Sequence, residues 1–496
     1  MSSVLRQCFD RLSMTYFDRL STTVLLQAHA STGSCFDRLM HDILSAFCIL
    51  PSAFKYYFRL MKTILLFGAG KSATCLIDYL GKCGEDYGWN LLVCDSNLSL
   101  TESKTKKFSS AQAVSFDVSN EEKRHEFISS ADIVISMLPP GLHFLVAKDC
   151  VAFSKSLLTA SYIDEKIKSL QSEIEKKGIL FLGEMGLDPG IDHISAMKMI
   201  HNIRKQGGEI YSFKSHCGGL VSPESDDNPW HYKITWNPAN VVMAGSAGAV
   251  FRNDGKTVTV PYAEIFNDEN NVVDVPGLSP LAWYANRDSL SYIDTYQLHD
   301  AKDFIRTTLR YPSYCRGWNK IIKLGLTVKN DYEEIKECKT FADWFALKKS
   351  KLNLSEADFF DAGFSEQIDY LGLREDEKIP MQDFDSATLL QYLLEKKLVM
   401  KPGDKDMIVM LHEIRYRIGE TNKEIRSCLI VKGEDQLHTA MAKTVGLPLG
   451  IAAKLILENK ITIRGLHIPV LPEIYEPVSK ELENNGIKFN EQVNDL

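Results

Sequence analysis

A glycine-rich turn directly follows a short apolar run, and this combination of residues can bind phosphate. The run Ile64-Leu65-Leu66-Phe67 continues into Gly68-Ala69-Gly70-Lys71-Ser72-Ala73. Gly68 allows a tight turn, Gly70 lets the backbone approach a pyrophosphate, and Ala73 leaves room for the next helix to pack on the strand. The N–H groups that begin this helix can then bind the phosphates. We therefore predict that residues 68–73 bind a dinucleotide. Leu65 excludes a mononucleotide-type phosphate loop, which needs glycine at that position.

Asp95 follows the next predicted strand, residues 90–94. A carboxylate at this point accepts hydrogen bonds from the hydroxyls of the adenosine ribose, and it would repel the 2′-phosphate of NADP. Three lysines lie on the helix predicted after it, and we expect them to face solvent: Lys104, Lys106 and Lys107. The sequence therefore predicts NAD as the cofactor, with NADP as the alternative.

A later predicted strand, residues 132–138, ends in a proline-rich loop. Its position in the βα pattern matches a strand whose carboxyl end borders the cofactor. We therefore expect Leu138 and Pro139 to contribute to the cofactor site.

The order of strands and helices predicts an α/β protein with a Rossmann-type dinucleotide-binding domain over residues 61–186. Residues 187–329 and 406–496 show longer, alternating strands, which predict an α+β domain; the resemblance described below implies that it serves substrate binding and dimerisation. Part of the C-terminal segment can pack back on the first domain. Residues 330–405 carry helical patterns alone and predict a small helical insertion.

The composition limits the classes of function. At 496 residues, 45% hydrophobic and 25% charged, the chain is expected to form two or three soluble domains. A net charge of −8 without a basic cluster argues against nucleic acid as a partner. We expect no membrane partner, because no run of eighteen apolar residues occurs. The eleven cysteines form no C-x-x-C pair, so we expect no metal site, no disulfide framework and a cytoplasmic location.

Residues 1–60 differ in character from the remainder. Phe-Asp-Arg-Leu occurs three times, at intervals too short for a solenoid repeat. Four aspartates argue against an organellar transit peptide. Met61 precedes the first strand in the way that dinucleotide-binding enzymes often begin. We expect residues 1–60 to be a non-native extension, with a disordered arm as the alternative.

Several motifs, in order along residues 61–490, resemble the glutamate-forming saccharopine dehydrogenases (saccharopine reductases). They are Gly186-Leu187-Asp188-Pro189-Gly190-Ile191-Asp192-His193, Cys217-Gly218-Gly219-Leu220 with Pro223-Glu224 and Asp227-Asn228-Pro229, Asn286-Arg287-Asp288-Ser289, Thr308-Leu309-Arg310-Tyr311, Thr444-Val445-Gly446-Leu447-Pro448 and Pro472-Glu473-Ile474-Tyr475. One position departs from the family, because Pro140 stands where a tyrosine is more common. No role of that tyrosine is therefore carried over.

The resemblance implies an oxidoreductase of lysine metabolism. In the oxidative direction the family removes a hydride from the secondary amine of saccharopine. Hydrolysis of the imine then gives glutamate and α-aminoadipate semialdehyde. Such a site needs a nicotinamide cofactor, cations for the substrate carboxylates, a proton acceptor and a cleft that excludes water. The resemblance also leads us to expect a homodimer.

Arg310 is the first candidate for binding a substrate carboxylate, because a guanidinium can donate two parallel hydrogen bonds to it. The alternative is a structural salt bridge. Arg287 is a second candidate, although it could pair with Asp288 instead. The family motifs add four further candidates for the substrate site: Thr308, Gly218, Gly219 and Asn286.

Candidates for proton transfer come from three motifs. The family pattern indicates Glu165, or Asp164 if the alignment is shifted by one residue, and either could instead be a charge at a helix start. Cys217 is expected to line the substrate site, with a nucleophilic role disfavoured. Asp188 is expected near the cofactor, although a cap or tight turn explains it equally well. His216 is a base or a structural residue.

Two other functions remain open at this point. One is an enzyme of the same fold that acts on the carbon–nitrogen bonds of a polyamine, which would need an acidic site with fewer arginines. The other is a non-enzymatic regulator that senses a dinucleotide, which the intact substrate motifs argue against.

Overall fold

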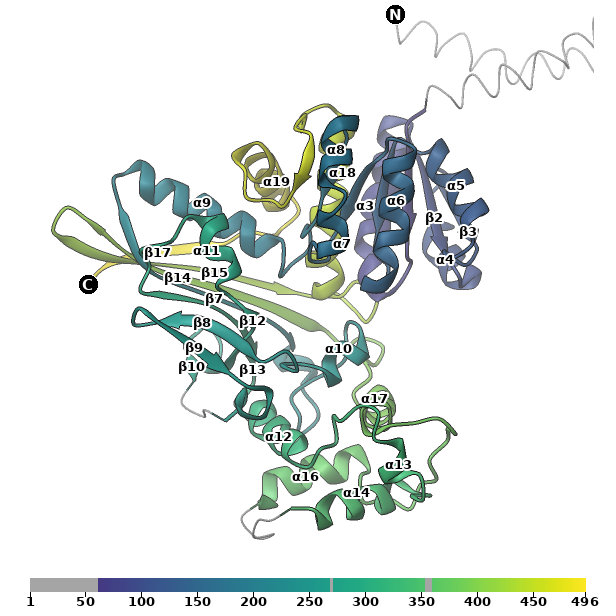
Figure 1. Ribbon diagram of the computed structural model, residues 1–496, viewed down its shortest axis with the longest axis vertical. Coiled ribbons are helices and arrows are strands. Elements are labelled where there is room, and N and C mark those ends of the chain that lie inside the picture. Colours follow the sequence, from purple (N-terminus) through teal and green to yellow (C-terminus); the bar gives the residue numbers. More distant parts are fainter. Residues whose placement is uncertain (1–60, 268–270, 353–358) are drawn as a thin grey trace, which may run out of the picture. The chain divides into compact units, whose positions relative to one another are not determined.

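The computed structural model describes residues 61–267, 271–352 and 359–496, and residues 63–496 form one compact unit. The predicted leader, residues 1–60, lies outside the described residues. Two sheets organise the described chain, one parallel and one mixed (Figure 1). The prediction of a Rossmann-type domain joined to an α+β domain is confirmed.

The parallel sheet has seven strands in the order β16-β6-β5-β4-β1-β2-β3. Their bounds are β1 (Thr63–Phe67), β2 (Asn90–Asp95), β3 (Ala111–Ser115), β4 (Ile133–Ser136), β5 (Ser156–Thr159), β6 (Leu180–Leu182) and β16 (Gly465–His467). Because β1 lies between β2 and β4, the glycine turn after β1 sits at the point where the chain direction across the sheet reverses. Ligands of open α/β sheets bind at this point.

Helices cover both faces of the parallel sheet. They are α3 (Thr74–Tyr87), α4 (Leu98–Thr105), α5 (Glu121–Ser130), α6 (His143–Ala152), α7 (Glu165–Lys168), α8 (Gln171–Lys177), α18 (Ala440–Leu457) and α19 (Pro472–Asn484). Ile64 and Leu66 of β1 share a core with α3 and α18, whereas Leu65 and Phe67 share one with α5, α6 and α8. The four consecutive apolar residues therefore belong to a strand that is buried on both faces.

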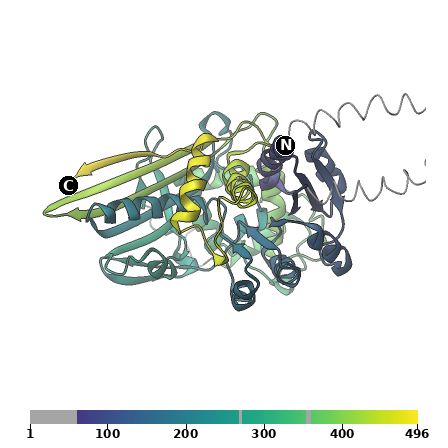
Figure 2. The ribbon, with the colours of Figure 1, turned by 90° about the horizontal axis from the view of Figure 1, so that it is seen from above.

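C-terminal elements complete the parallel sheet, with β16 pairing with β6 and α18 packing against α3 and α19 (Figure 2). In the described part of the chain, α18 is the one helix long and apolar enough to cross a membrane. Of its apolar window, 78% is buried inside the protein, as in a core helix. Gly446 permits the close packing, because a Cβ there would lie 3.0 Å from the Leu76 side chain.

The mixed sheet has ten strands, seven of them in the order β10-β11-β13-β7-β14-β15-β17. Their bounds are β7 (Glu209–Val221), β10 (Val272–Val273), β11 (Leu281–Ala285), β13 (Asp303–Arg310), β14 (Asp406–Ile418), β15 (Thr421–Lys432) and β17 (Asn490–Asp495). Strands β8 (Ala249–Asn253), β9 (Lys256–Val260) and β12 (Arg287–Asp288) branch from this path, and α9 (Ile191–Lys205), α10 (Pro238–Val242) and α11 (Ser291–Tyr296) accompany the sheet.

A helical layer, drawn in green in Figure 1, packs against β11 of this sheet. Its helices are α12 (Pro312–Lys323), α13 (Tyr332–Ile335), α14 (Phe341–Ser350), α16 (Ala362–Leu371) and α17 (Ser386–Lys397). Their core includes the fully buried side chains of Trp230, Trp318 and Trp344. This helical layer therefore begins at α12, before the start of the insertion expected from the sequence.

Candidate active site

A cavity of about 760 Å³ lies between the carboxyl ends of the parallel strands and the near face of the mixed sheet. One wall comes from the glycine turn and from the loops after β4, β5 and β6. The opposite wall comes from β7, β11 and β13. The sequence-predicted residues that line it are Ser72, Asp164, Asp188, Cys217, Gly218, Gly219, Asn286, Arg287, Thr308 and Arg310. Segments that are far apart in the sequence thus meet at one site.

The glycine turn has the geometry of a phosphate cradle. Gly68 has φ +100°, and a Cβ there would lie 2.8 Å from the carbonyl oxygen of Met137. No atom lies within 4 Å of a Cβ built on Gly70, so the backbone is open to a ligand there. Neither the 3-10 turn Lys71–Ala73 nor α3 has a side-chain N-cap. No side-chain cap therefore competes with a ligand at this helix start, which fits the phosphates of a dinucleotide.

Two charged side chains flank this turn. Asp95 accepts hydrogen bonds from the backbone N–H groups of Ala69 (2.8 Å) and Asn97 (3.0 Å). Lys104 donates to the carbonyl oxygens of Ala69 (2.8 Å) and Gly70 (2.7 Å). Burial lowers the pKa of Lys104 to about 8. The expectation that this lysine faces solvent is therefore wrong, because its ammonium folds over the glycine turn.

The other two lysines of this group differ from Lys104. Lys106 is exposed, and Lys107 is exposed with its ammonium 2.7 Å from the carboxylate of Asp78. In the proline-rich loop, Pro140 lines the cavity, whereas the predicted residues Leu138 and Pro139 directly before it do not.

One face of β13 presents Arg306, Thr308 and Arg310, because side chains alternate along a strand. The register places Thr308 beside Cys217 of β7 on one side and beside Tyr284 of β11 on the other. Thr308, Arg310, Cys217 and Tyr284 all line the cavity. This face of β13 therefore carries a guanidinium at each end of a short row, and of the two Arg310 lines the cavity.

Arg310 is buried, with 4% of its surface exposed. One of its terminal nitrogens donates to the carbonyl oxygen of Leu309 at 2.8 Å, and its Nε has no hydrogen-bond partner. Its guanidinium lies over the rings of Tyr232 and Tyr314, at 5.3 and 5.6 Å from their centroids. Among the described residues no carboxylate pairs with it. The alternative of a structural salt bridge is therefore not what the geometry shows.

Arg306 is equally buried but fully paired. Its guanidinium donates to the carboxylates of Asp188 and Asp192, the latter at 2.7 Å, and lies 4.6 Å from the centroid of Tyr292. Burial by itself would lower the pKa of Arg306, but the two carboxylates hold it well above its ordinary value. This cation therefore orders the end of the cavity where α9 begins.

The two aspartates respond differently to this environment. Burial raises the pKa of Asp188 to about 6, although Arg306 opposes the change. Asp192 also accepts a hydrogen bond from the N–H of Gly190 at 2.6 Å. Burial favours its neutral form, but His193 and Arg306 hold the pKa of Asp192 below its ordinary value. Asp188 therefore has the pKa of a group that can take up and release protons near neutrality.

Cys217 lines the cavity, but its thiol is not activated. Burial, with Asp188 and Asp192 adding to it, raises the pKa of Cys217 well above its ordinary value. A nucleophilic thiolate would need the opposite change. Behind it, Gly218 allows close strand packing, because a Cβ there would lie 2.5 Å from the carbonyl oxygen of Leu309.

The two acidic candidates after β5 occupy different places. Asp164 lines the cavity and caps α7 by accepting a hydrogen bond from the N–H of Ile167 at 2.8 Å. Glu165 does not line the cavity. Its side chain is 87% exposed and pairs with Lys168 at 2.8 Å. This is the helix-start charge that was the alternative for Glu165.

Arg287 lines the cavity from a strained backbone with φ +52°. Its guanidinium lies 5.5 Å from the ring centroid of Tyr162. Asp288, its expected internal partner, accepts hydrogen bonds from the N–H groups of Leu290 and Ser291 instead. Arg287 thus remains open to a ligand.

Two histidines in or next to the family motifs lie behind the cavity and contact structural partners. His216 points away from Cys217, with its ring nitrogens near Thr307 Oγ1 (2.7 Å) and Glu413 (3.2 Å). His193 is fully buried between Glu184 (2.9 Å) and Tyr296 (2.6 Å). Both have structural partners.

Sequence reasoning did not select Arg306, Tyr162, Glu184 or His143 for the site. A signal existed for Arg306, because it lies four residues before Arg310 on a predicted strand and therefore shares its face. No pattern indicated Glu184, which accepts a hydrogen bond from the distant Tyr292, or His143, whose partners Ser136 and Ser161 lie 7 and 18 positions away.

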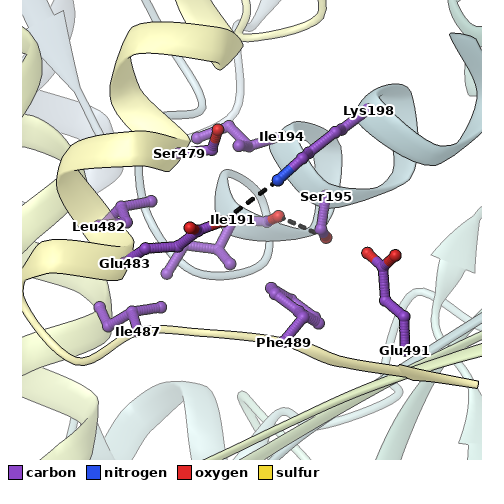
Figure 3. A pocket seen from close by; sticks show the side chains of 10 residues that line it. All are labelled: Ile191, Ile194, Ser195, Lys198, Ser479, Leu482, Glu483, Ile487, Phe489 and Glu491. Atoms are coloured by element: carbon purple, nitrogen blue, oxygen red, sulfur yellow. Dashed lines mark hydrogen bonds and ion pairs between the residues drawn. The ribbon is translucent and has the colours of Figure 1, made fainter. Parts of the chain in front are cut away.

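A second cavity, of about 240 Å³, lies between α9, α19 and residues 487–491 (Figure 3). Lys198 and Glu483 form an ion pair across it at 3.1 Å, and Ile191, Ile194 and Leu482 contribute apolar surface. It contains none of the sequence-predicted site residues. The larger cavity is therefore the candidate active site.

Comparisons with known proteins agree with this geometry. The model of the saccharopine dehydrogenase C-terminal domain matches residues 186–487, and the model of the saccharopine dehydrogenase NADP binding domain matches residues 64–182. The saccharopine dehydrogenase (NADP⁺, L-glutamate-forming) of Saccharomyces cerevisiae is 34% identical, over 87% of this chain and 99% of its own.

A solved structure and a longer relative are also similar. The structure of the apo, histidine-tagged L-Glu-forming saccharopine dehydrogenase from Saccharomyces cerevisiae matches with a TM-score of 0.78, covering 87% of this chain and all of that one. The mitochondrial alpha-aminoadipic semialdehyde synthase of Bos taurus is 36% identical over 87% of this chain. This chain spans 48% of that relative's length.

Proposed function

The chain belongs to the saccharopine dehydrogenase family, and we propose that it interconverts saccharopine with glutamate and α-aminoadipate semialdehyde. The observation that supports this most is Arg310, a buried guanidinium without a carboxylate partner among the described residues, in the cavity that the glycine turn also borders. A buried, unpaired charge is costly, and a substrate carboxylate would compensate it.

Each charged group of the cavity has a distinct role in this proposal. Arg310 binds one substrate carboxylate from β13, and Arg287 binds a second from β12. The cofactor, when bound, exchanges a hydride with the carbon beside the substrate nitrogen. Asp188 accepts the proton that the nitrogen or the attacking water releases, since its pKa of about 6 leaves it ionised at neutral pH.

Other residues of the cavity position these groups. Arg306 and Asp192 hold Asp188 in place through the buried ion pairs. Cys217 contributes a neutral thiol to the wall beside Thr308. Together they orient the substrate and keep the reacting end of the cavity out of bulk water.

The site fits a nicotinamide dinucleotide, and we propose that NADP is preferred. Two comparisons favour NADP over the NAD expected from Asp95: the NADP binding domain model and the fungal relatives named for NADP⁺. Lys104 supports this proposal, since its ammonium has backbone carbonyls for partners and lies over the turn, where it would attract a 2′-phosphate. Asp95 is meanwhile engaged by two backbone N–H groups.

The test is a kinetic assay of the purified chain with saccharopine and either cofactor, following the absorbance of the reduced nicotinamide. We expect saccharopine-dependent reduction, with a higher kcat/KM for NADP than for NAD. Absence of turnover with saccharopine, together with turnover of a polyamine, would favour the carbon–nitrogen enzyme of the other class. Arg287 and Arg310 argue against that class, because a polyamine is cationic and no carboxylate in the described part of the chain pairs with either arginine.

The homodimer and the cytoplasmic location remain predictions. The animal relatives are named as mitochondrial, so the compartment needs its own measurement. Light scattering on the eluting protein would measure the mass of the assembly, and cell fractionation would locate the enzyme.

A further inference from the structure

A buried histidine connects two serine hydroxyls beside the active-site cavity. His143 begins α6, and its Nδ1 lies 2.8 Å from Oγ of Ser136 at the end of β4. Its Nε2 lies 2.8 Å from Oγ of Ser161, just after β5. Ser136 is fully buried, whereas both His143 and Ser161 line the cavity. The imidazole therefore spans two neighbouring strand ends and holds a hydroxyl at the cavity wall.

The protonation state of this histidine suits a holding role. Burial lowers the pKa of His143 to about 4, against a small opposing effect of Asp164. At neutral pH the ring is therefore neutral, with one nitrogen that donates and one that accepts. Each nitrogen has one serine partner, so both hydrogen bonds form at the same time. A neutral ring also adds no positive charge beside an oxidised nicotinamide.

The strand order indicates which end of the cofactor meets this hydroxyl. The glycine turn of β1 holds the pyrophosphate, and Asp95 at the end of β2 marks the adenosine side. Strands β4 and β5 lie on the opposite side of β1. Ser161 and His143 therefore lie on the nicotinamide side, in the same cavity as Asp188.

We propose that the Ser161 hydroxyl hydrogen-bonds the carboxamide of the nicotinamide, and that His143 is the positioning residue that fixes this hydroxyl. A carboxamide both donates and accepts, so either orientation of the hydroxyl can serve it. This inference rests on the proposed function, because it takes the cofactor to be a nicotinamide dinucleotide. The proposal gives Ser161 and His143, two neutral side chains, a role in recognising the nicotinamide.

Equilibrium binding without substrate tests the proposal directly. The probes are NADPH, followed by its fluorescence, and 2′-phospho-ADP-ribose, which lacks the nicotinamide, followed by calorimetry. Ser161→Ala should weaken NADPH about three- to tenfold, the loss of one hydrogen bond, and leave 2′-phospho-ADP-ribose unchanged. Ser161→Thr keeps a hydroxyl and should retain at least half of the wild-type affinity. Equal losses for both probes, or none for NADPH, would overturn the assignment.

The positioning role of His143 has a separate test. His143→Phe should weaken NADPH as much as Ser161→Ala does, and the double variant should lose no more than either single variant. Additive losses would mean that the histidine acts in another way. If His143→Phe fails to fold, Ser136→Ala replaces it, and unchanged NADPH affinity in that variant counts against the role.

Failure of this inference can be told apart from failure of the proposed function. If the wild-type chain binds neither probe, the cofactor assignment itself is wrong. If the wild type binds both and Ser161→Ala binds them equally well, the contact to the carboxamide alone is wrong.

Discussion

The two ends of the β13 wall carry the same side chain in opposite circumstances. Arg306 and Arg310 lie on one face of one strand, and each is 4% exposed. Arg306 donates to two buried carboxylates, whereas Arg310 has backbone carbonyls and aromatic rings around it. At the first end, the charge of Arg306 is compensated within the protein. At the second end, no carboxylate of the described residues pairs with the guanidinium of Arg310.

This difference separates a structural cation from one suited to a ligand. A buried ion pair gains little net stability, but removal of one partner leaves an uncompensated charge and is costly. At Arg310 the unfavourable state already exists in the free protein. Binding of a carboxylate there would therefore gain the full charge-assisted interaction.

The largest effect is expected for the proton acceptor at the paired end. Asp188→Asn should fold, because Asp192 still pairs with Arg306, but kcat/KM for saccharopine oxidation should fall about 10²- to 10⁴-fold. In the wild type the rate should decline as pH falls through about 6, because Asp188 becomes protonated and can no longer accept a proton. A pH profile of both proteins checks this. Persistence of the acidic decline in the variant would assign it to another group.

Removal of the paired cation should mainly reduce stability. Arg306→Met leaves two carboxylates buried without their partner, and the free energy of unfolding should fall by about 3–5 kcal/mol. Urea denaturation measures it. The control is Arg415→Met, at a surface pair with Glu424 whose arginine is 50% exposed, and there the change should stay below about 1 kcal/mol. Similar losses in Arg306→Met and Arg415→Met would mean that the buried pairs of Arg306 matter no more than a surface pair, which would contradict the structural role given to Arg306.

Removal of the unpaired cation should have the opposite pattern. Arg310→Met should leave the free energy of unfolding unchanged or raise it, since a buried charge without a carboxylate is lost. The Michaelis constant for saccharopine should rise, and kcat/KM should fall about ten- to a hundredfold, with cofactor affinity unchanged. Steady-state kinetics beside urea denaturation checks both parts. A destabilised variant with normal saccharopine kinetics would remove Arg310 from the substrate site.

The smallest effect concerns a third cation, Lys104, which also has backbone carbonyls as partners. Lys104→Met should lower kcat/KM for NADP about two- to fivefold and leave NAD nearly unchanged, since the site is partly open to solvent. Asp95→Ser should shift the ratio toward NADP, because a repulsive charge is removed. Initial rates with both cofactors measure this ratio. A wild-type preference for NAD, unaffected by Lys104→Met, would restore the expectation drawn from Asp95.

The sequence alone was sufficient for the dinucleotide-binding domain and for the family. The apolar run before Gly68 and the small residues after it act locally, so their roles can be inferred from spacing. The motif around Arg310 likewise marks residues that line the larger cavity. Glu165 shows the limit of this reasoning, because a one-residue difference between neighbouring carboxylates decides which of them reaches the cavity.

Tertiary structure alone decided which charges are paired and which are open. Arg306 and Arg310 have the same type and share a strand face, and nothing in their local sequence shows which of them is paired. The partners of Arg306 come from the segment around residue 190, more than a hundred positions away along the chain. The partners of His143 and Lys104 lie nearer along the chain, 7 to 35 positions away, but they too belong to other strand ends and turns. Local sequence determines which residues form a helix, strand or turn, whereas ion pairing and burial depend on contacts that exist only once the sheets are assembled.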